Sequence, residues 1–143
     1  SYMAKIELFE NPIFGAAIRR CHAFPVKRGE SDRGAIKAAV TVLKEGRVLG
    51  LFPEGTRSKT GQLQKAEAGV ALIAAMTGAP IVPVAILNTH RIFANGGLLP
   101  QLRIMYGAPM SFQGDRKSKE ALDIFSAEIM SHIAQMKDEL SKM

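Results

Sequence analysis

The sequence predicts an α/β fold: a layered, mostly parallel sheet flanked by helices. Helix and strand patterns alternate along the 143 residues, with Gly, Pro and polar breakers between them. Apolar residues make up 47% of the chain and charged residues 22%, a composition typical of globular proteins. This length suits one compact domain, so we expect a single domain over residues 1–143.

The first part of the chain is predicted to contain helical segments and one short strand. Residues 3–9 are expected to form a short helical piece. Asn11 is an expected N-cap and a proline follows it, so a helix should run from there to about Cys21. That cysteine is the only one, which excludes an internal disulfide, and we expect it to be a small buried residue. Residues 23–26 form a short extended segment, in which Pro25 indicates a sheet edge or a strand end.

The middle of the chain alternates between strand and helix patterns. Apolar residues at helical spacing predict a helix that Ser31 caps and Gly46 ends. Residues 48–52 are a continuous apolar run, as expected of a buried parallel strand. A polar segment over 53–66 follows, and an apolar helix over 69–77 comes after it.

The last third is predicted to contain two strands and a long helix. The strands are expected over 81–87 and 102–106, with a loop over 88–101 between them. The helix should run from about Ser118 to Leu140. Its apolar stripe consists of Leu122, Phe125, Ile129, Ile133, Met136 and Leu140.

Residues 52–58, Phe-Pro-Glu-Gly-Thr-Arg-Ser, form the candidate binding loop because they directly follow a predicted strand. Ligands of parallel α/β sheets bind beyond the carboxyl ends of the strands. Gly55 lets the backbone approach a ligand closely. Thr56 offers a hydroxyl, and Arg57 offers a planar fork that suits phosphate. Glu54 can orient an arginine or accept a hydrogen bond from a substrate hydroxyl. The alternative is a polar surface loop in which this glutamate and arginine only pair with each other.

A second basic element, Arg28, follows the extended segment 23–26. If the two strand ends are neighbours, Arg28 and Arg57 converge on one anion; a solvated turn is the alternative. The net charge of +6 fits an anionic partner or simply a basic soluble protein. The chain lacks nucleic-acid recognition motifs and stacking aromatics interleaved with basic residues, which argues against a nucleic-acid partner.

Three segments resemble conserved blocks of the glycerophospholipid acyltransferase family. Residues 52–58 resemble the third block, and 82–84 resemble the fourth. Residues 23–29 resemble the second block, with Arg28 in the arginine position. The resemblance runs over about residues 3–86 and implies a glycerol-3-phosphate acyltransferase-like fold.

The resemblance also implies a reaction and a site. The family transfers a fatty acyl group from acyl-CoA or acyl-carrier protein to 1-acyl-sn-glycerol 3-phosphate (lysophosphatidic acid), giving phosphatidic acid, and it needs no cofactor or metal. Family members often carry a lysine shortly before the glycine that matches Gly69, which makes Lys65 a further candidate for the phosphate. The substrate-binding residues implied are Arg28, Glu54, Gly55, Thr56, Arg57 and Lys65.

The acceptor and product of this reaction reside in bilayers. We therefore expect peripheral attachment to the inner face of the cell membrane, with an anionic membrane surface as a partner. No apolar stretch approaches the ~18 residues of a membrane span. Several apolar residues near the start of the chain, among basic ones, either face the membrane or pack into the core. These are Ile6, Leu8, Phe9, Ile13 and Phe14.

The catalytic block of the family, a His followed five residues later by an Asp, is absent from this chain. In the family, the His is the general base for the acceptor hydroxyl and the Asp orients it. The residues five positions after the three histidines, His22, His90 and His132, are Lys27, Asn95 and Lys137. We therefore expect that the N-terminal part of the domain is missing and that this chain alone is inactive. The alternatives are a non-catalytic phosphate- or phospholipid-binding module and an acyltransferase for another lipid acceptor.

Overall fold

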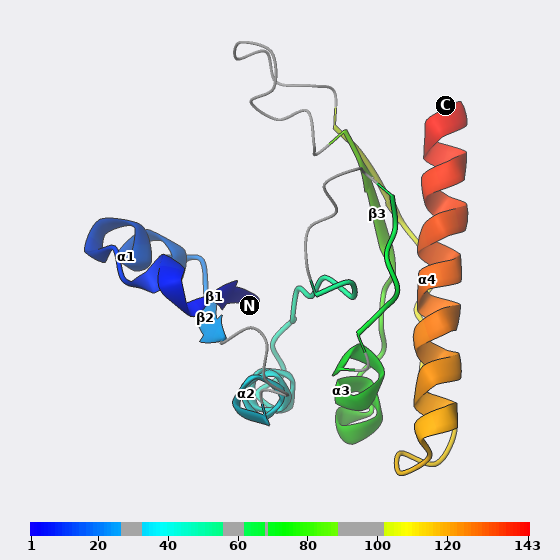
Figure 1. Ribbon diagram of the computed structural model, residues 1–143, viewed down its shortest axis with the longest axis horizontal. Coiled ribbons are helices and arrows are strands. Elements are labelled where there is room, and N and C mark those ends of the chain that lie inside the picture. Colours follow the sequence, from blue (N-terminus) through cyan, green and yellow to red (C-terminus); the bar gives the residue numbers. More distant parts are fainter. Residues whose placement is uncertain (27–32, 56–61, 68, 89–101) are drawn as a thin grey trace. The chain divides into compact units, whose positions relative to one another are not determined.

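The chain divides into two compact units, Ser1–Phe52 and Pro53–Met143 (Figure 1). It contains helices and a parallel strand pair, so the predicted α/β class is confirmed. A single domain over residues 1–143 stays a prediction. The residues that this computed structural model describes are 1–26, 33–55, 62–67, 69–88 and 102–143.

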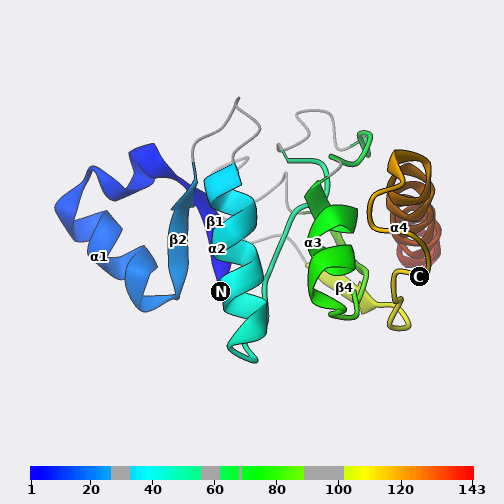
Figure 2. The ribbon, with the colours of Figure 1, turned by 90° about the horizontal axis from the view of Figure 1, so that it is seen from below.

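The first unit is built on a parallel pair of strands. Strand β1 (Tyr2–Lys5) pairs with β2 (Ala23–Val26). Between them the chain forms the 3-10 helix η1 (Ile6–Phe9) and helix α1 (Pro12–Arg20) (Figure 2). The helical prediction for residues 3–9 is right for η1 and wrong for β1. Met, Ala and Lys in β1 favour helix locally, and pairing with β2 overrides that preference.

Helix α1 begins where the sequence predicts. The Asn11 side-chain oxygen accepts hydrogen bonds from the backbone N–H groups of Ile13 (3.1 Å) and Phe14 (3.0 Å). Gly15 is buried against the backbone of Phe9, where an added Cβ would lie 2.9 Å from the carbonyl oxygen. Cys21 caps the end of the helix and is exposed, so the prediction of a buried cysteine is wrong.

Helix α2 (Arg33–Lys44) buries Ala39 and Val42. Gly46 ends the helix as predicted, because its φ of +72° belongs to the left-handed region that glycine adopts most easily. The predicted cap, Ser31, lies outside the described residues.

The prediction of a buried strand over 48–52 is wrong within this unit. Only Gly50 forms a bridge, a parallel one with Tyr2. Val48 is 81% exposed and Phe52 is 72% exposed. The apolar run therefore borders the sheet at one point and does not form a ladder along its length.

The second unit packs two helices with an antiparallel strand pair. Strand β3 (Val84–Leu87) pairs with β4 (Arg103–Tyr106), and helix α4 (Lys119–Lys142) packs along both (Figure 1). Helix α3 (Gly69–Thr77) packs against α4. The antiparallel pairing differs from the parallel pairing in the first unit, and the strand patterns alone did not reveal it.

Helix α4 begins after Ser118, whose hydroxyl accepts a hydrogen bond from the N–H of Ala121 (3.2 Å). Five of the six residues of the predicted apolar stripe are buried, and Leu122 is partly buried. The apolar core of this unit is built from α3, β3 and α4. Its residues are Val70, Ala71, Ile73, Ala74, Ala85, Phe125, Ile129, Ile133, Met136 and Leu140.

Candidate phosphate-binding loop

The candidate loop is closed by two hydrogen bonds across its base. The carbonyl oxygen of Pro53 accepts a hydrogen bond from the N–H of Glu67 at 2.7 Å. One carboxylate oxygen of Glu54 accepts a hydrogen bond from the N–H of Gln64 at 2.8 Å. A carboxylate is a strong acceptor for a backbone N–H. These bonds hold residues 53–54 against residues 64–67, shortly before α3 begins at Gly69.

Gly55 is required at its position for two reasons. Its φ is +64°, in the left-handed region, which costs other residues roughly 1–2 kcal/mol. In addition, a Cβ on this residue would lie 2.8 Å from Cγ of Glu67. The tight turn after Glu54 and the close approach of Glu67 both depend on the missing side chain.

The structure describes three of the six predicted site residues. Glu54 and Gly55 lie in the described segment 53–55, and Lys65 is exposed in the segment 62–67, which the two hydrogen bonds join to it. Arg28, Thr56 and Arg57 lie outside the described residues, so the convergence of the two arginines stays a prediction. For Glu54 the structure adds a backbone partner that sequence reasoning missed.

Gln64 and Glu67 were not predicted as parts of the site. Both take part in the closure of the loop through their backbone N–H groups, and the side chain of Glu67 also lies close to Gly55. Backbone donors carry no residue-type signal, so no sequence pattern could have revealed them. For Glu67, the only signal was its place just before the glycine that starts α3.

The charges of the described loop suit an anion only in part. Lys65 supplies an exposed cation, and the N-terminus of α3 adds a partial positive charge nearby in sequence. Glu54 and Glu67 are carboxylates, and the first of them is engaged with a backbone N–H. The described residues of the loop therefore offer an anion both an exposed cation and carboxylates.

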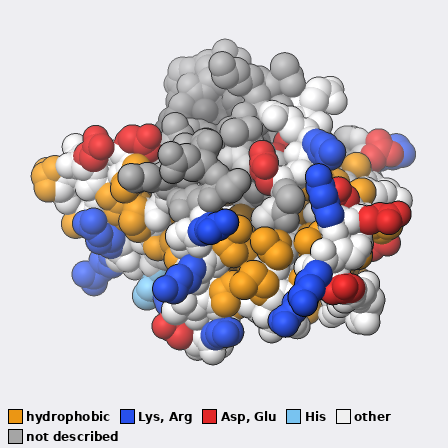
Figure 3. Space-filling model, turned by 60° about the horizontal axis from the view of Figure 1, so that its bottom comes forward, with side chains coloured by type: hydrophobic (Ala, Val, Ile, Leu, Met, Phe, Trp, Pro, Cys, Tyr) orange, Lys and Arg blue, Asp and Glu red, His pale blue; other side chains and the backbone are white. Residues whose placement is uncertain are grey.

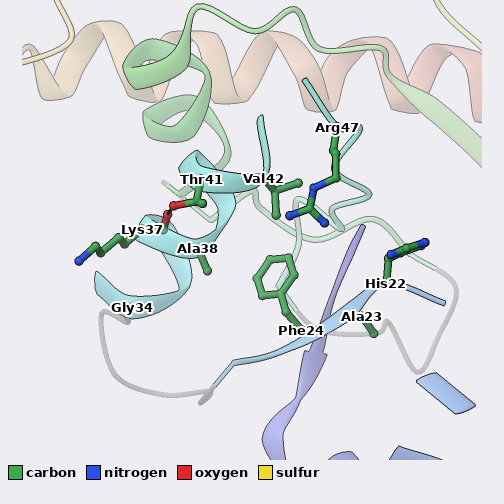
Figure 4. Close-up of a pocket in the computed structure, with 9 residues that line it drawn as sticks. All are labelled: His22, Ala23, Phe24, Gly34, Lys37, Ala38, Thr41, Val42 and Arg47. Carbon is green, nitrogen blue, oxygen red and sulfur yellow. Dashed lines mark hydrogen bonds between the residues drawn. The ribbon is translucent and has the colours of Figure 1, made fainter. Parts of the chain in front are cut away.

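A separate pocket lies in the first unit, between β2 and α2 (Figure 4). It has a volume of about 490 Å³. Phe24 and Val42 give it an apolar lining, and His22, Lys37 and Arg47 lie around it. Of the predicted site residues that the structure describes, none lines this pocket.

Two further findings concern the described residues only. No group of three or more His, Cys, Asp or Glu side chains in them is placed to hold a metal ion. None of the helices in this part of the chain combines the length and apolar composition that a bilayer span requires.

Comparisons with known proteins agree with the resemblance of the sequence blocks. A family model described as Acyltransferase matches residues 1–87. The 1-acyl-sn-glycerol-3-phosphate acyltransferase of Bacillus subtilis is 33% identical over 148 residues, and the match covers 99% of this chain and 71% of that protein. The enzyme of the same name from Streptococcus pneumoniae is 33% identical, with 96% of this chain and 51% of that protein covered.

A solved structure shares the fold. The crystal structure of the 1-acyl-sn-glycerophosphate acyltransferase PlsC from Thermotoga maritima superimposes with a TM-score of 0.74 at 27% identity. The match covers all of this chain and 57% of that protein. By family model, sequence and fold, the chain belongs to the acyltransferase family of the 1-acyl-sn-glycerol-3-phosphate acyltransferases.

Proposed function

We propose that this chain is the acceptor-binding part of an enzyme that acylates 1-acyl-sn-glycerol 3-phosphate to phosphatidic acid, with acyl-CoA or acyl-carrier protein as donor. The relatives from B. subtilis and S. pneumoniae carry the name of this activity. The observation that carries the proposal is the start of this loop, where Glu54 accepts a hydrogen bond from the Gln64 N–H and the chain turns at Gly55.

The reaction moves an acyl group from the sulfur of the donor to an oxygen of the acceptor. The free hydroxyl of the acceptor attacks the thioester carbonyl of the donor, a C–O bond forms, and the C–S bond breaks. The hydroxyl proton must leave during the attack, and the thiolate leaving group takes up a proton. The His and Asp that perform this proton transfer in the family have no counterparts in the 143 residues.

In this proposal the chain holds the acceptor by its phosphate. Arg28 and Arg57 supply forked donors that can bind phosphate oxygens in pairs, and Lys65 adds a point charge. Thr56 donates from its hydroxyl. Glu54 keeps the loop in shape, since its carboxylate holds the Gln64 N–H.

Binding of the acceptor tests the proposal without any need for turnover. The probe is a short-chain, water-soluble lysophosphatidic acid, and its dissociation constant is measured by calorimetry. Arg57→Ala and Arg57→Lys should each weaken binding at least about tenfold, because the bidentate contact to phosphate is lost in both. Arg116→Ala, an exposed arginine of the second unit that the proposal does not use, is the control and should bind normally. Equal affinity of all variants would contradict a phosphate site at this loop.

A non-catalytic phospholipid-binding module is the second candidate, and the missing His and Asp favour it. Both candidates bind the acceptor, so turnover separates them. The gene product, read from its own start codon, is mixed with acyl-CoA or acyl-carrier protein and lysophosphatidic acid. Release of free CoA or carrier protein supports the enzyme. Acceptor binding without release from any acyl donor supports the module.

We also propose that the protein works as a peripheral protein on the anionic inner face of the cell membrane. The acceptor and the product are membrane lipids, so the site has to meet a bilayer. The net charge of +6 suits an anionic surface, to which each basic side chain near the surface adds roughly 1 kcal/mol of attraction.

A further inference from the structure

Helix α1 presents an apolar end to solvent. Ile13 is 83% exposed and Phe14 is 50% exposed, although both are large hydrophobic residues. Ile6 and Leu8 of the preceding turn η1 are also exposed, at 38% and 43%. The sequence left open whether these residues face a membrane or pack into the core. In this unit they do not join the core.

The orientation of α1 explains the exposure. Gly15 faces the backbone of Phe9, so the helix rests on η1 through the side that lacks a side chain. Ile13, Ala17 and Arg20 follow one another at helical spacing on the opposite side, and all three are exposed. The inner contact is fixed by the glycine, and the outer face combines apolar and basic residues.

The charges of α1 are all positive. The helix contains Arg19 and Arg20 and no acidic residue. Arg19 lies over the ring of Phe9, with its guanidinium carbon 5.1 Å from the ring centre, which holds this cation against η1. Glu7 and Glu10 belong to the turn before the helix. At the left of Figure 3, where α1 lies, hydrophobic and basic side chains are visible, with acidic side chains above them.

We propose that α1 is the membrane-docking helix of this chain and that its occupant is an anionic lipid bilayer. Ile13 and Phe14 enter the boundary between headgroups and acyl chains, and Arg19 and Arg20 bind lipid phosphates. An apolar side beside basic residues is the pattern of helices that lie in the membrane interface. The proposal rests on the proposed function, which requires the site to meet bilayer lipids.

The absence of tryptophan from the sequence allows a direct test. Phe14→Trp places a single indole on α1, and Ile124→Trp places one at a similarly exposed position on α4 (54%) as the control. The full chain is mixed with vesicles of phosphatidylcholine that contain about one third phosphatidylglycerol. The emission of the Phe14→Trp chain should shift to the blue and be quenched by brominated acyl chains. The indole of the Ile124→Trp chain should stay exposed to water when that chain is sedimented with the same vesicles.

A substitution arm separates insertion from simple attraction. Ile13→Asp in the Phe14→Trp background should weaken vesicle binding at least about tenfold, because a buried apolar contact is lost. Val48→Asp introduces the same charge at a similarly exposed apolar residue (81%) outside the helix, and this chain should bind vesicles as before. Arg20→Glu should weaken binding more than Arg116→Glu, and pure phosphatidylcholine vesicles should bind poorly.

Several outcomes would overturn the docking role of α1. They are sedimentation without a spectral shift, no sedimentation at all, and a blue-shifted spectrum before lipid is added, which would mean that protein covers the helix. Equal loss of binding in the Ile13→Asp and Val48→Asp chains would also overturn it. The readout involves no turnover. Failure of the acyltransferase assay with insertion intact would therefore count against the proposed function alone.

Discussion

Glu54 and Gly55 are adjacent residues that shape the candidate loop through different contacts. The carboxylate of Glu54 holds the N–H of Gln64, and Gly55 leaves room for the side chain of Glu67. Both contacts are made within the protein. The loop therefore has a structural requirement for both residues that is separate from any binding role.

Removal of the Glu54 carboxylate should loosen the base of the loop. Glu54→Ala leaves the Gln64 N–H without this acceptor, at a cost of about 1 kcal/mol for the local bond. Hydrogen exchange of the Gln64 amide should then be about fivefold faster. Glu54→Gln keeps an acceptor oxygen and should preserve most of the protection. Equal exchange in the alanine variant and the unchanged chain would contradict the contact.

Substitution of Gly55 should separate backbone strain from crowding. Gly55→Ala should lower the free energy of unfolding by roughly 1–2 kcal/mol from its φ of +64° alone, with an added cost from Glu67. Gly78→Ala is the matched control, because Gly78 has a φ of +68° and an added Cβ there would meet nothing within 4 Å.

Two further variants are needed, the single substitution Glu67→Ala and the double substitution Gly55→Ala with Glu67→Ala. The double variant removes the Cγ atom that crowds the new methyl group, so the two substitutions together should cost less than the sum of the single costs. Chemical denaturation measures the free energy of unfolding of the two single variants, the double variant and the Gly78→Ala control. Strict additivity would mean that Glu67 moves aside freely.

The site could be predicted only as far as residue types signal chemistry. Glu54, Gly55 and Lys65 were named from the sequence and lie in two segments that hydrogen bonds join. The partners Gln64 and Glu67 were not, because a backbone N–H and a close approach to glycine depend on how the chain folds back. Nothing in the spacing of the sequence encodes that return.

At the scale of elements, periodicity succeeded where one face of a helix is buried. The stripe of α4 was predicted from helical spacing, and Ile129 within it is 2% exposed. Short segments were less predictable. Residues 2–5 form a strand because β2 pairs with them, and residues 48–52 lack such a ladder. An apolar run of five residues does not reveal how many neighbouring strands it pairs with.

The buried stripe of α4 should dominate the stability of the second unit. Ile129→Ala should lower the free energy of unfolding by about 2–5 kcal/mol, since it leaves a cavity in a packed core. Ile124 on the same helix is 54% exposed, so Ile124→Ala should change it by less than about 0.5 kcal/mol. Denaturant titration followed by circular dichroism measures both. Similar losses for the two variants would mean that α4 is not packed through this stripe.

Over the whole chain, the match to the family is not accompanied by the catalytic residues of the family. The chain matches its family over residues 1–87, yet no His in it is followed five residues later by an Asp. Loss of a general base typically lowers the rate by about 10²–10⁴-fold. The residues proposed to hold the acceptor do not replace a group that removes a proton.

We therefore predict that the 143-residue chain alone binds lysophosphatidic acid but does not acylate it at a measurable rate. The B. subtilis relative, assayed beside it with the same acyl donors and acceptor, is the positive control. A boiled sample of the chain sets the background. Turnover by the chain above that background would mean that another of its groups accepts the proton. His22 would be the first residue to replace. His22→Gln retains a polar side chain and removes the titratable group, so loss of turnover in that variant would identify the base.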